Sequence, residues 1–158
     1  MDYALTFLDS FSPLSRTCQP HDSFPNFKAA EYMGSWYEQV HTIGSAFQPN
    51  DTVCNQVIYT DLTSEGRFKV YNSGQSALGA KRGGVHGDAY CPDSTGDCYA
   101  KFFVQLSDHP NYMVIDTDYT TYSVIYQCNI RQENVWLITR DPIMGEALHL
   151  KMLNIVTE

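Results

Sequence analysis

Short stretches of alternating apolar and polar residues constrain the fold of this chain more than any other feature. Eight such stretches, rich in β-branched and aromatic residues, follow one another along the 158 residues. A period of two places alternate side chains on opposite faces of a β-strand. The predicted strands are residues 36–42, 53–62, 67–72, 84–90, 99–106, 112–116, 122–128 and 134–140. Short strands at such regular spacing predict an all-β sandwich or an up-and-down barrel.

Turn-forming residues separate the predicted strands. Ser64-Glu65-Gly66 ends the second strand, and residues 92–97 and 107–111 form two further connections. Residues 72–84 carry Gly74, Gly79, Gly83 and Gly84 without periodicity, which predicts a mobile loop.

Two helices complete the predicted elements. A short turn is expected within residues 27–33, ended by Gly34. A second helix is expected near the C-terminus, with Asp141 as its N-cap and Pro142 at its first position. Its apolar face for packing on the strands consists of Ala147, Leu148, Leu150, Met152, Leu153 and Ile155.

Length and charge narrow the classes of function. The length suits one domain, which we place at residues 18–158, after a loose N-terminal arm at residues 1–17. That arm lacks the pattern of a secretory signal, because Asp2 stands where such a signal carries positive charge. A net charge of -8 without a Lys/Arg stripe argues against nucleic-acid binding. No apolar run reaches the roughly 18 residues of a membrane-spanning helix.

Cysteine and histidine placement argues against a metal site and against catalysis. The five cysteines lack metal-ligand spacing, so disulfides in an oxidising, extracellular compartment are expected, with buried free thiols as the alternative. No Ser/His/Asp group or phosphate-binding glycine loop is present, so no enzyme activity and no metal are predicted. His41 and His86 lie on strands and either reach a ligand or serve as surface or structural residues. The histidines are scattered singly, at His21, His41, His86, His109 and His149.

Three sequence blocks carry a resemblance to a known family. Gly34-Ser35-Trp36-Tyr37-Glu38 opens the first strand, Asp116-Thr117-Asp118-Tyr119 precedes the seventh, and residues 136–142 (WLITRDP) close the eighth. In this order they resemble the lipocalin family, in the branch that contains apolipoprotein D, insect bilin-binding proteins and crustacean carotenoid proteins. The resemblance implies an eight-stranded antiparallel up-and-down β-barrel with one C-terminal helix. Such a barrel is just wide enough to hold one small ligand.

The resemblance also implies structural roles. With Gly34 opening the strand, Trp36 closes the barrel floor and Arg140 packs over its indole, a cation–π contact. The alternative is an Arg140 that caps its strand in solvent. A disulfide between Cys18 and Cys128 is implied by the family pattern.

The other cysteines are read from local spacing. Cys91 and Cys98 flank a short connection between two strands, where a disulfide would staple the hairpin. That leaves Cys54 with four alternatives: a buried thiol, a bond to another chain or a further segment, a covalent anchor for a chromophore or lipid, or a catalytic thiol.

Strand alternation, aligned on Trp36, predicts which side chains face the ligand. The inward residues, all expected to bind ligand, are Glu38, Val40, Asn55, Val57, Tyr59, Phe68, Val70, Phe102, Val104, Trp136 and Ile138. A mostly apolar wall with a few polar groups is typical of a small-molecule site. The alternative is that these residues fill a closed core.

These observations predict a secreted carrier of one small hydrophobic ligand. By resemblance the first candidate is a pigment, either a bilin such as biliverdin or a carotenoid, followed by a fatty acid, steroid or retinoid. No cofactor is required, and residues 73–84 are expected to gate the barrel. Two alternatives stay open: an enzyme that uses Cys54 as nucleophile, and an interaction protein with a filled barrel. Association into a homo-oligomer, through Cys54 or an unpaired strand edge, also stays open.

Overall fold

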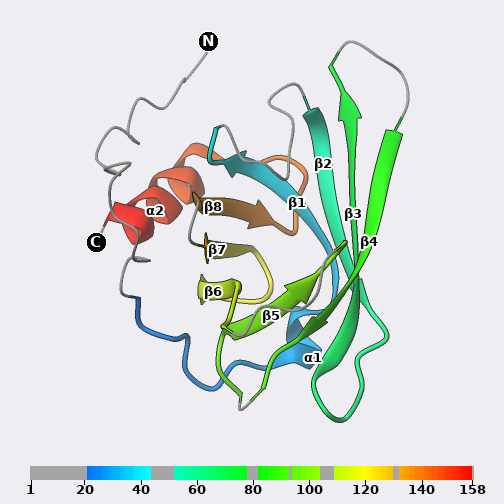
Figure 1. The fold of residues 1–158 in the computed structure, drawn as a ribbon. Helices are drawn as coiled ribbons and strands as arrows, with labels where there is room; N and C mark the ends of the chain where they lie inside the picture. The colour runs from blue at the N-terminus through cyan, green and yellow to red at the C-terminus, as the bar shows by residue number, and fades with distance from the viewer. Residues whose placement is uncertain are drawn as a thin grey trace.

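Eight antiparallel strands close into one barrel, each strand pairing with the next and β8 pairing with β1 (Figure 1). This computed structural model describes residues 21–43, 52–77, 82–92, 94–103, 109–129 and 132–157. The elements are α1 (Ala29–Tyr32), β1 (Gly34–His41), β2 (Thr52–Thr60), β3 (Arg67–Ser76), β4 (Arg82–Tyr90), β5 (Asp97–Lys101), β6 (Tyr112–Thr117), β7 (Tyr122–Asn129), β8 (Gln132–Thr139) and α2 (Glu146–Thr157). The predicted up-and-down barrel with one C-terminal helix is confirmed. The proposed arm at residues 1–17 lies outside the described residues.

Of the three clusters of buried apolar side chains in the described residues, two matter most for the barrel interior and its outer wall. One fills the closed end of the interior around Trp36, Tyr32 and Phe68. The other lies outside the barrel, where Met152 of α2 packs on Val124 of β7 and neighbouring side chains of β7 and β8. Figure 1 shows α2 lying against this outer wall. The helix α2 therefore packs on the outer face of β7 and β8.

The C-terminal helix begins later than its sequence predicts. Asp141 is not an N-cap: its Oδ1 accepts a hydrogen bond from the backbone N–H of Ile143 at 3.0 Å, within a bend over residues 141–143. This local bond is a common alternative to capping for aspartate. The helix therefore starts at Glu146, and Pro142 belongs to the preceding bend.

The glycine-rich segment is largely strand rather than loop. β3 continues to Ser76 and β4 begins at Arg82, so most of the predicted loop at residues 72–84 is paired sheet, and residues 78–81 lie outside the described residues. Gly74 has a local reason: a Cβ there would lie 2.2 Å from Asn55 Oδ1. Glycine thus lets the Asn55 side chain lie flat across the neighbouring strand. β2, β3 and β4 rise above the rest of the barrel (Figure 1).

Two β-bulges change the alternation of β1 and β2. In β1 the register shifts between Glu38, opposite Ile138, and Val40, opposite Leu137. In β2 it shifts between Val53 and Gln56, at a point where Cys54 has a positive φ of 54°. An extra residue in one strand of a pair turns the following side chains to the other face.

Within the described residues, no helix is both long enough and apolar enough to cross a membrane.

Candidate functional site in the barrel interior

The floor of the barrel is sealed around Trp36, which is fully buried. The Arg140 guanidinium lies 3.7 Å from the centre of the Trp36 ring, as the family resemblance implies. It donates hydrogen bonds to the backbone carbonyls of Tyr119 and Ser35, both at 2.9 Å, and of Glu31 at 3.1 Å. Gly34, with a φ of +93°, opens β1 beside this guanidinium. These contacts close one end of the interior.

A cluster of tyrosine hydroxyls lies just above the floor. The Tyr32 hydroxyl is 2.9 Å from Ser123 Oγ and 3.3 Å from the Tyr112 hydroxyl, which is 2.5 Å from that of Tyr59. Burial raises the pKa of Tyr32 to about 12 and also raises the pKa values of Tyr59 and Tyr112. These hydroxyls therefore stay neutral and satisfy one another.

Farther from the floor, the inner wall of the barrel is apolar, and its side chains differ in how deeply they are buried. Phe68, Val70 and Ile138 are buried in the interior core. Val57 and Trp136 pack against the same core but remain half-buried. Val57 and Trp136 therefore keep some solvent access, whereas the residues nearer the floor do not.

A polar cluster stands at the open end of this wall. Glu38 Oε1 lies 2.8 Å from His41 Nδ1 and accepts a hydrogen bond from Asn55 Nδ2 at 3.0 Å. Asn55 Nδ2 also lies 3.3 Å from Thr52 Oγ1. The Glu38 and His41 side chains are only 14% and 16% exposed, in keeping with a position inside the barrel.

Two further polar side chains face inward from β7 and β8. Asn134 lies opposite Gln127, two residues from Trp136 on the same face of β8. Asn134 Nδ2 donates to Gln127 Oε1 at 3.3 Å, and Asn134 is 1% exposed. Its Oδ1 has no hydrogen-bond partner in the described part of the chain.

The bulge in β1 explains why the predicted orientation of Val40 is wrong and why His41 faces the interior. Val40 was predicted to face the interior, but it packs against the outer core beneath α2. The bulge turns His41 inward instead, opposite Trp136. Alternation alone contains no signal of a bulge. Gln127 and Asn134, by contrast, were detectable as polar residues at inward positions of their strands.

The remaining predicted wall residues lie as follows. Phe102 is half-buried against the interior core, while Phe103 is 84% exposed. β5 ends at Lys101 rather than at residue 106, and Val104 lies outside the described residues.

The described cysteines are three disulfide-bonded residues and one free thiol. Cys91 and Cys98 form the predicted disulfide. Cys128 is disulfide-bonded, but Cys18 lies outside the described residues, so the Cys18–Cys128 pairing stays a prediction. Cys54 is a free, exposed thiol on the β2 bulge, so its interpretation as a buried thiol is wrong. Among the described residues, no three His, Cys, Asp or Glu side chains gather so as to hold a metal.

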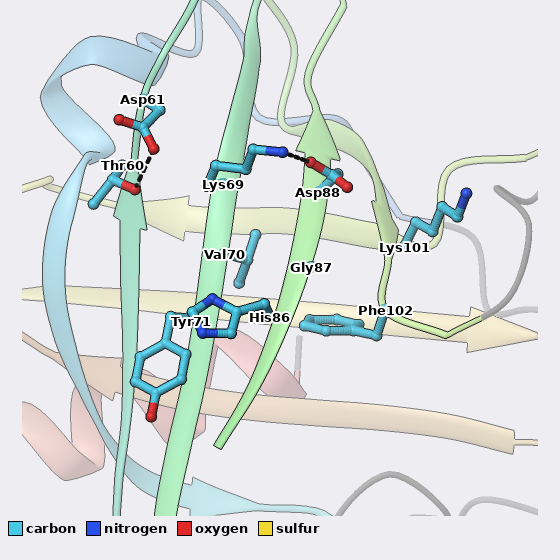
Figure 2. Close-up of a pocket in the computed structure, with 10 residues that line it drawn as sticks. All are labelled: Thr60, Asp61, Lys69, Val70, Tyr71, His86, Gly87, Asp88, Lys101 and Phe102. Atoms are coloured by element: carbon cyan, nitrogen blue, oxygen red, sulfur yellow. Dashed lines mark hydrogen bonds and ion pairs between the residues drawn. The ribbon is translucent and has the colours of Figure 1, made fainter.

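A second hollow lies beside β3 and β4, where β5 ends (Figure 2). This shallow pocket has a volume of about 300 Å³. Lys69 and Asp88 form an ion pair across it, and the rings of Tyr71 and His86 stack with centres 4.5 Å apart. His86 is therefore an exposed residue of the outer wall. Because these side chains already satisfy one another, the interior is the stronger candidate site.

Comparison with known proteins agrees with the barrel geometry. Residues 27–158 match the family model of the lipocalin-like domain. Bovine apolipoprotein D is 29% identical over 139 residues, covering 84% of this chain and 70% of that protein.

Solved structures show the same fold. Insecticyanin from the tobacco hornworm Manduca sexta superposes with a TM-score of 0.71 at 19% identity, covering 89% of this chain and 78% of that one. The tryptamine complex of the amine-binding protein of Rhodnius prolixus gives a TM-score of 0.68 at 18% identity, covering 89% and 79%. With the family model spanning most of the barrel and α2, the chain belongs to the lipocalin family.

Proposed function

We propose that this protein is an extracellular, non-enzymatic carrier that holds one small hydrophobic ligand inside its barrel. The proposal is carried by how burial changes along the barrel interior. Trp36 at the floor is fully buried, whereas Val57 and Trp136, farther from the floor on the apolar inner wall, are only half-buried. Binding would be driven by removal of apolar ligand surface from water. The Cys91–Cys98 disulfide supports an oxidising compartment.

For the ligand, a pigment such as a bilin or a carotenoid remains our first candidate, ahead of a fatty acid, steroid or retinoid. Insecticyanin and crustacyanin are among the structural neighbours, and apolipoprotein D is a sequence relative. The predicted ligand-facing set, without Val40, supplies the contacts.

The first test of this proposal is ligand binding by the purified protein. An absorption spectrum would reveal a co-purified pigment as a visible band. Titration with biliverdin, a carotenoid, retinol and a fluorescent fatty acid should give saturable one-to-one binding for at least one of them. If none binds at micromolar concentration, the carrier function is contradicted.

A bulky substitution on the inner wall tests whether the ligand binds inside the barrel. Val57→Trp adds bulk to the half-buried inner wall and should abolish binding, because an eight-stranded barrel has little spare width. Thr60→Trp lies on the same strand at an exposed position and is the matched control. Binding retained by Val57→Trp would contradict a ligand in the interior, and its loss in Thr60→Trp alone would place the ligand in the pocket of Figure 2, which Thr60 lines.

A further inference from the structure

One tyrosine of the cluster near the floor borders the part of the interior that keeps solvent access. The Tyr112 side chain projects inward from β6, since its hydroxyl contacts that of Tyr59, whereas the next residue, Met113, belongs to a different cluster of buried side chains. Tyr32 and Tyr59 are 0% and 3% exposed, but Tyr112 is only half-buried. A ligand that enters the interior would therefore meet Tyr112 before the rest of the cluster.

Apolar side chains face Tyr112 from other parts of the inner wall. Val57 of β2, Trp136 of β8 and Phe102, which follows β5, pack against the same interior core and are likewise half-buried. Because these strands are spread around a closed barrel, the four side chains surround the interior. The apolar ones can hold the body of a ligand, and Tyr112 adds a polar group.

The hydroxyls of the cluster carry one more proton than their mutual contacts use. Three contacts, of 2.9, 3.3 and 2.5 Å, join four hydroxyls in the order Ser123, Tyr32, Tyr112 and Tyr59. Within the described residues, these side chains make no other hydrogen bond. Each hydroxyl has one proton, so four donors serve three bonds. When Tyr32 and Tyr59 both donate to Tyr112, the unused O–H is that of Tyr112.

Burial keeps this proton on the hydroxyl. Desolvation holds the pKa of Tyr112 well above its ordinary value of 10.0, and it raises the pKa of Tyr59 in the same way. The unused O–H is therefore a donor at neutral pH. A buried donor without an acceptor is unfavourable, so a ligand atom that accepts a hydrogen bond is favoured beside it.

We propose that the ligand carries a carbonyl group, as in a ketone, aldehyde, ester or amide, whose oxygen accepts a hydrogen bond from Tyr112 while the apolar body lies against Val57 and Trp136. A carbonyl oxygen has lone pairs and no proton, so it complements a site whose unused group is a donor. A hydrocarbon of the same shape would leave that O–H unpaired. This inference rests on the proposed carrier function and specifies the chemistry of the inner end of its ligand.

A ketone and a hydrocarbon of matched shape test the inference. Valerophenone and pentylbenzene differ only in a carbonyl group that replaces one methylene group. We expect Tyr112→Phe to weaken valerophenone binding about three- to tenfold, the range of one neutral hydrogen bond, and to change pentylbenzene binding by less than about twofold. Calorimetry or displacement of a bound fluorescent probe gives the dissociation constants.

Tyr32→Phe is the matched control, because it removes the same group from the same cluster. Tyr32 is fully buried at the floor, and the remaining pair of Tyr112 and Tyr59 still has one proton more than its single contact uses. Valerophenone should therefore bind folded Tyr32→Phe as it binds the wild type.

The infrared band of the bound ketone reports the hydrogen bond directly. The difference spectrum between carbon-13-labelled and unlabelled valerophenone isolates its carbonyl stretch from the protein background. Because a hydrogen bond weakens the C=O bond, this band should lie at lower wavenumber in the wild type and in Tyr32→Phe than in Tyr112→Phe. A merely structural role of Tyr112 would not move the band.

The outcomes separate this inference from the carrier function. Equal loss of ketone affinity in the two variants, or neither loss nor band shift in Tyr112→Phe, overturns the carbonyl inference alone. Failure of valerophenone to bind a protein that binds a pigment, retinoid or fatty acid also overturns it. If none of these compounds binds, the carrier function falls as well.

Circular dichroism checks that both variants fold. If Tyr112→Phe does not fold, the carbonyl band of valerophenone in the wild-type complex is compared with that in hexane. A lowered wavenumber supports the inference, and an unshifted band contradicts it.

Discussion

Arg140 is the residue through which three separate segments meet. Its guanidinium bonds to carbonyls of α1, β1 and the loop before β7 while it lies over Trp36. A planar fork of five N–H donors suits this task, and the single ammonium of lysine does not. The family resemblance indicated the Trp36 contact, but the three carbonyl contacts depend on distant backbone that no local pattern encodes.

Arg140→Lys should therefore lower the free energy of unfolding by about 2–3 kcal/mol, through lost charge-assisted hydrogen bonds despite retained charge. Urea unfolding followed by tryptophan fluorescence measures the change. Arg67→Lys is the control, because Arg67 is exposed and lies 4.7 Å from the centre of the Tyr90 ring. A similar loss in both variants would show that the fork at the floor has no special role.

At the scale of elements, the positions of the strands were largely predictable from the sequence. Which side chains of each strand face the interior was predictable only in part. Alternation located all eight strands, because one face of each packs on a core. It failed at β1, where the bulge after Glu38 exchanges Val40 for His41 on the inner face. It also failed at residues 72–84, because glycines that admit a neighbouring side chain resemble glycines of a loop.

Gly74 of β3 and Gly83 of β4, which pair with each other, offer a test of this interpretation. Gly74→Ala forces the Asn55 side chain to move, which should break its bond to Glu38 and cost about 1 kcal/mol of stability. Gly83→Ala is a matched control, since Gly83 lies opposite Gly74 in the register and a Cβ there meets nothing within 4 Å. Thermal unfolding of the two variants makes the comparison. Equal destabilisation would indicate a general cost in β-sheet geometry instead of a contact with Asn55.

For the whole molecule, the two ends of the barrel have different chemistry. The closed end combines the interior core, the Cys91–Cys98 disulfide and the neutral tyrosine cluster. The other end carries polar side chains, where Glu38 Oε1 lies within hydrogen-bond distance of His41 Nδ1 and accepts from Asn55 Nδ2. Composition and net charge are averages over the chain, so they cannot show that the two ends of the barrel differ in their side chains. Three-dimensional placement was needed to see it.

The tyrosine cluster predicts how stability of the whole fold depends on alkaline pH. The pKa of Tyr32 is about 12 in the folded state against an ordinary value of 10.0, so the folded state holds the proton more tightly. The contribution of Tyr32 is complete below pH 10 and is lost as pH rises toward 12, by an amount on the order of 2–3 kcal/mol. The pKa values of Tyr59 and Tyr112 shift in the same direction.

Tyr32→Phe should accordingly be less stable at neutral pH, where it loses the Ser123 bond, yet show a shallower decline between pH 10 and 11.5. Urea midpoints at several pH values provide the measurement. Tyr71→Phe, on the outer wall, should retain the wild-type slope. Parallel slopes for wild type and Tyr32→Phe would refute the assignment.

The β2 bulge has a practical consequence. It presents the exposed thiol of Cys54 next to Asn55 in the chain, at the rim of the barrel, while Cys91, Cys98 and Cys128 are held in disulfides. A maleimide dye would therefore attach beside the entrance to the interior. The chain thus carries a natural labelling position from which the arrival and departure of a ligand become visible as changes in fluorescence.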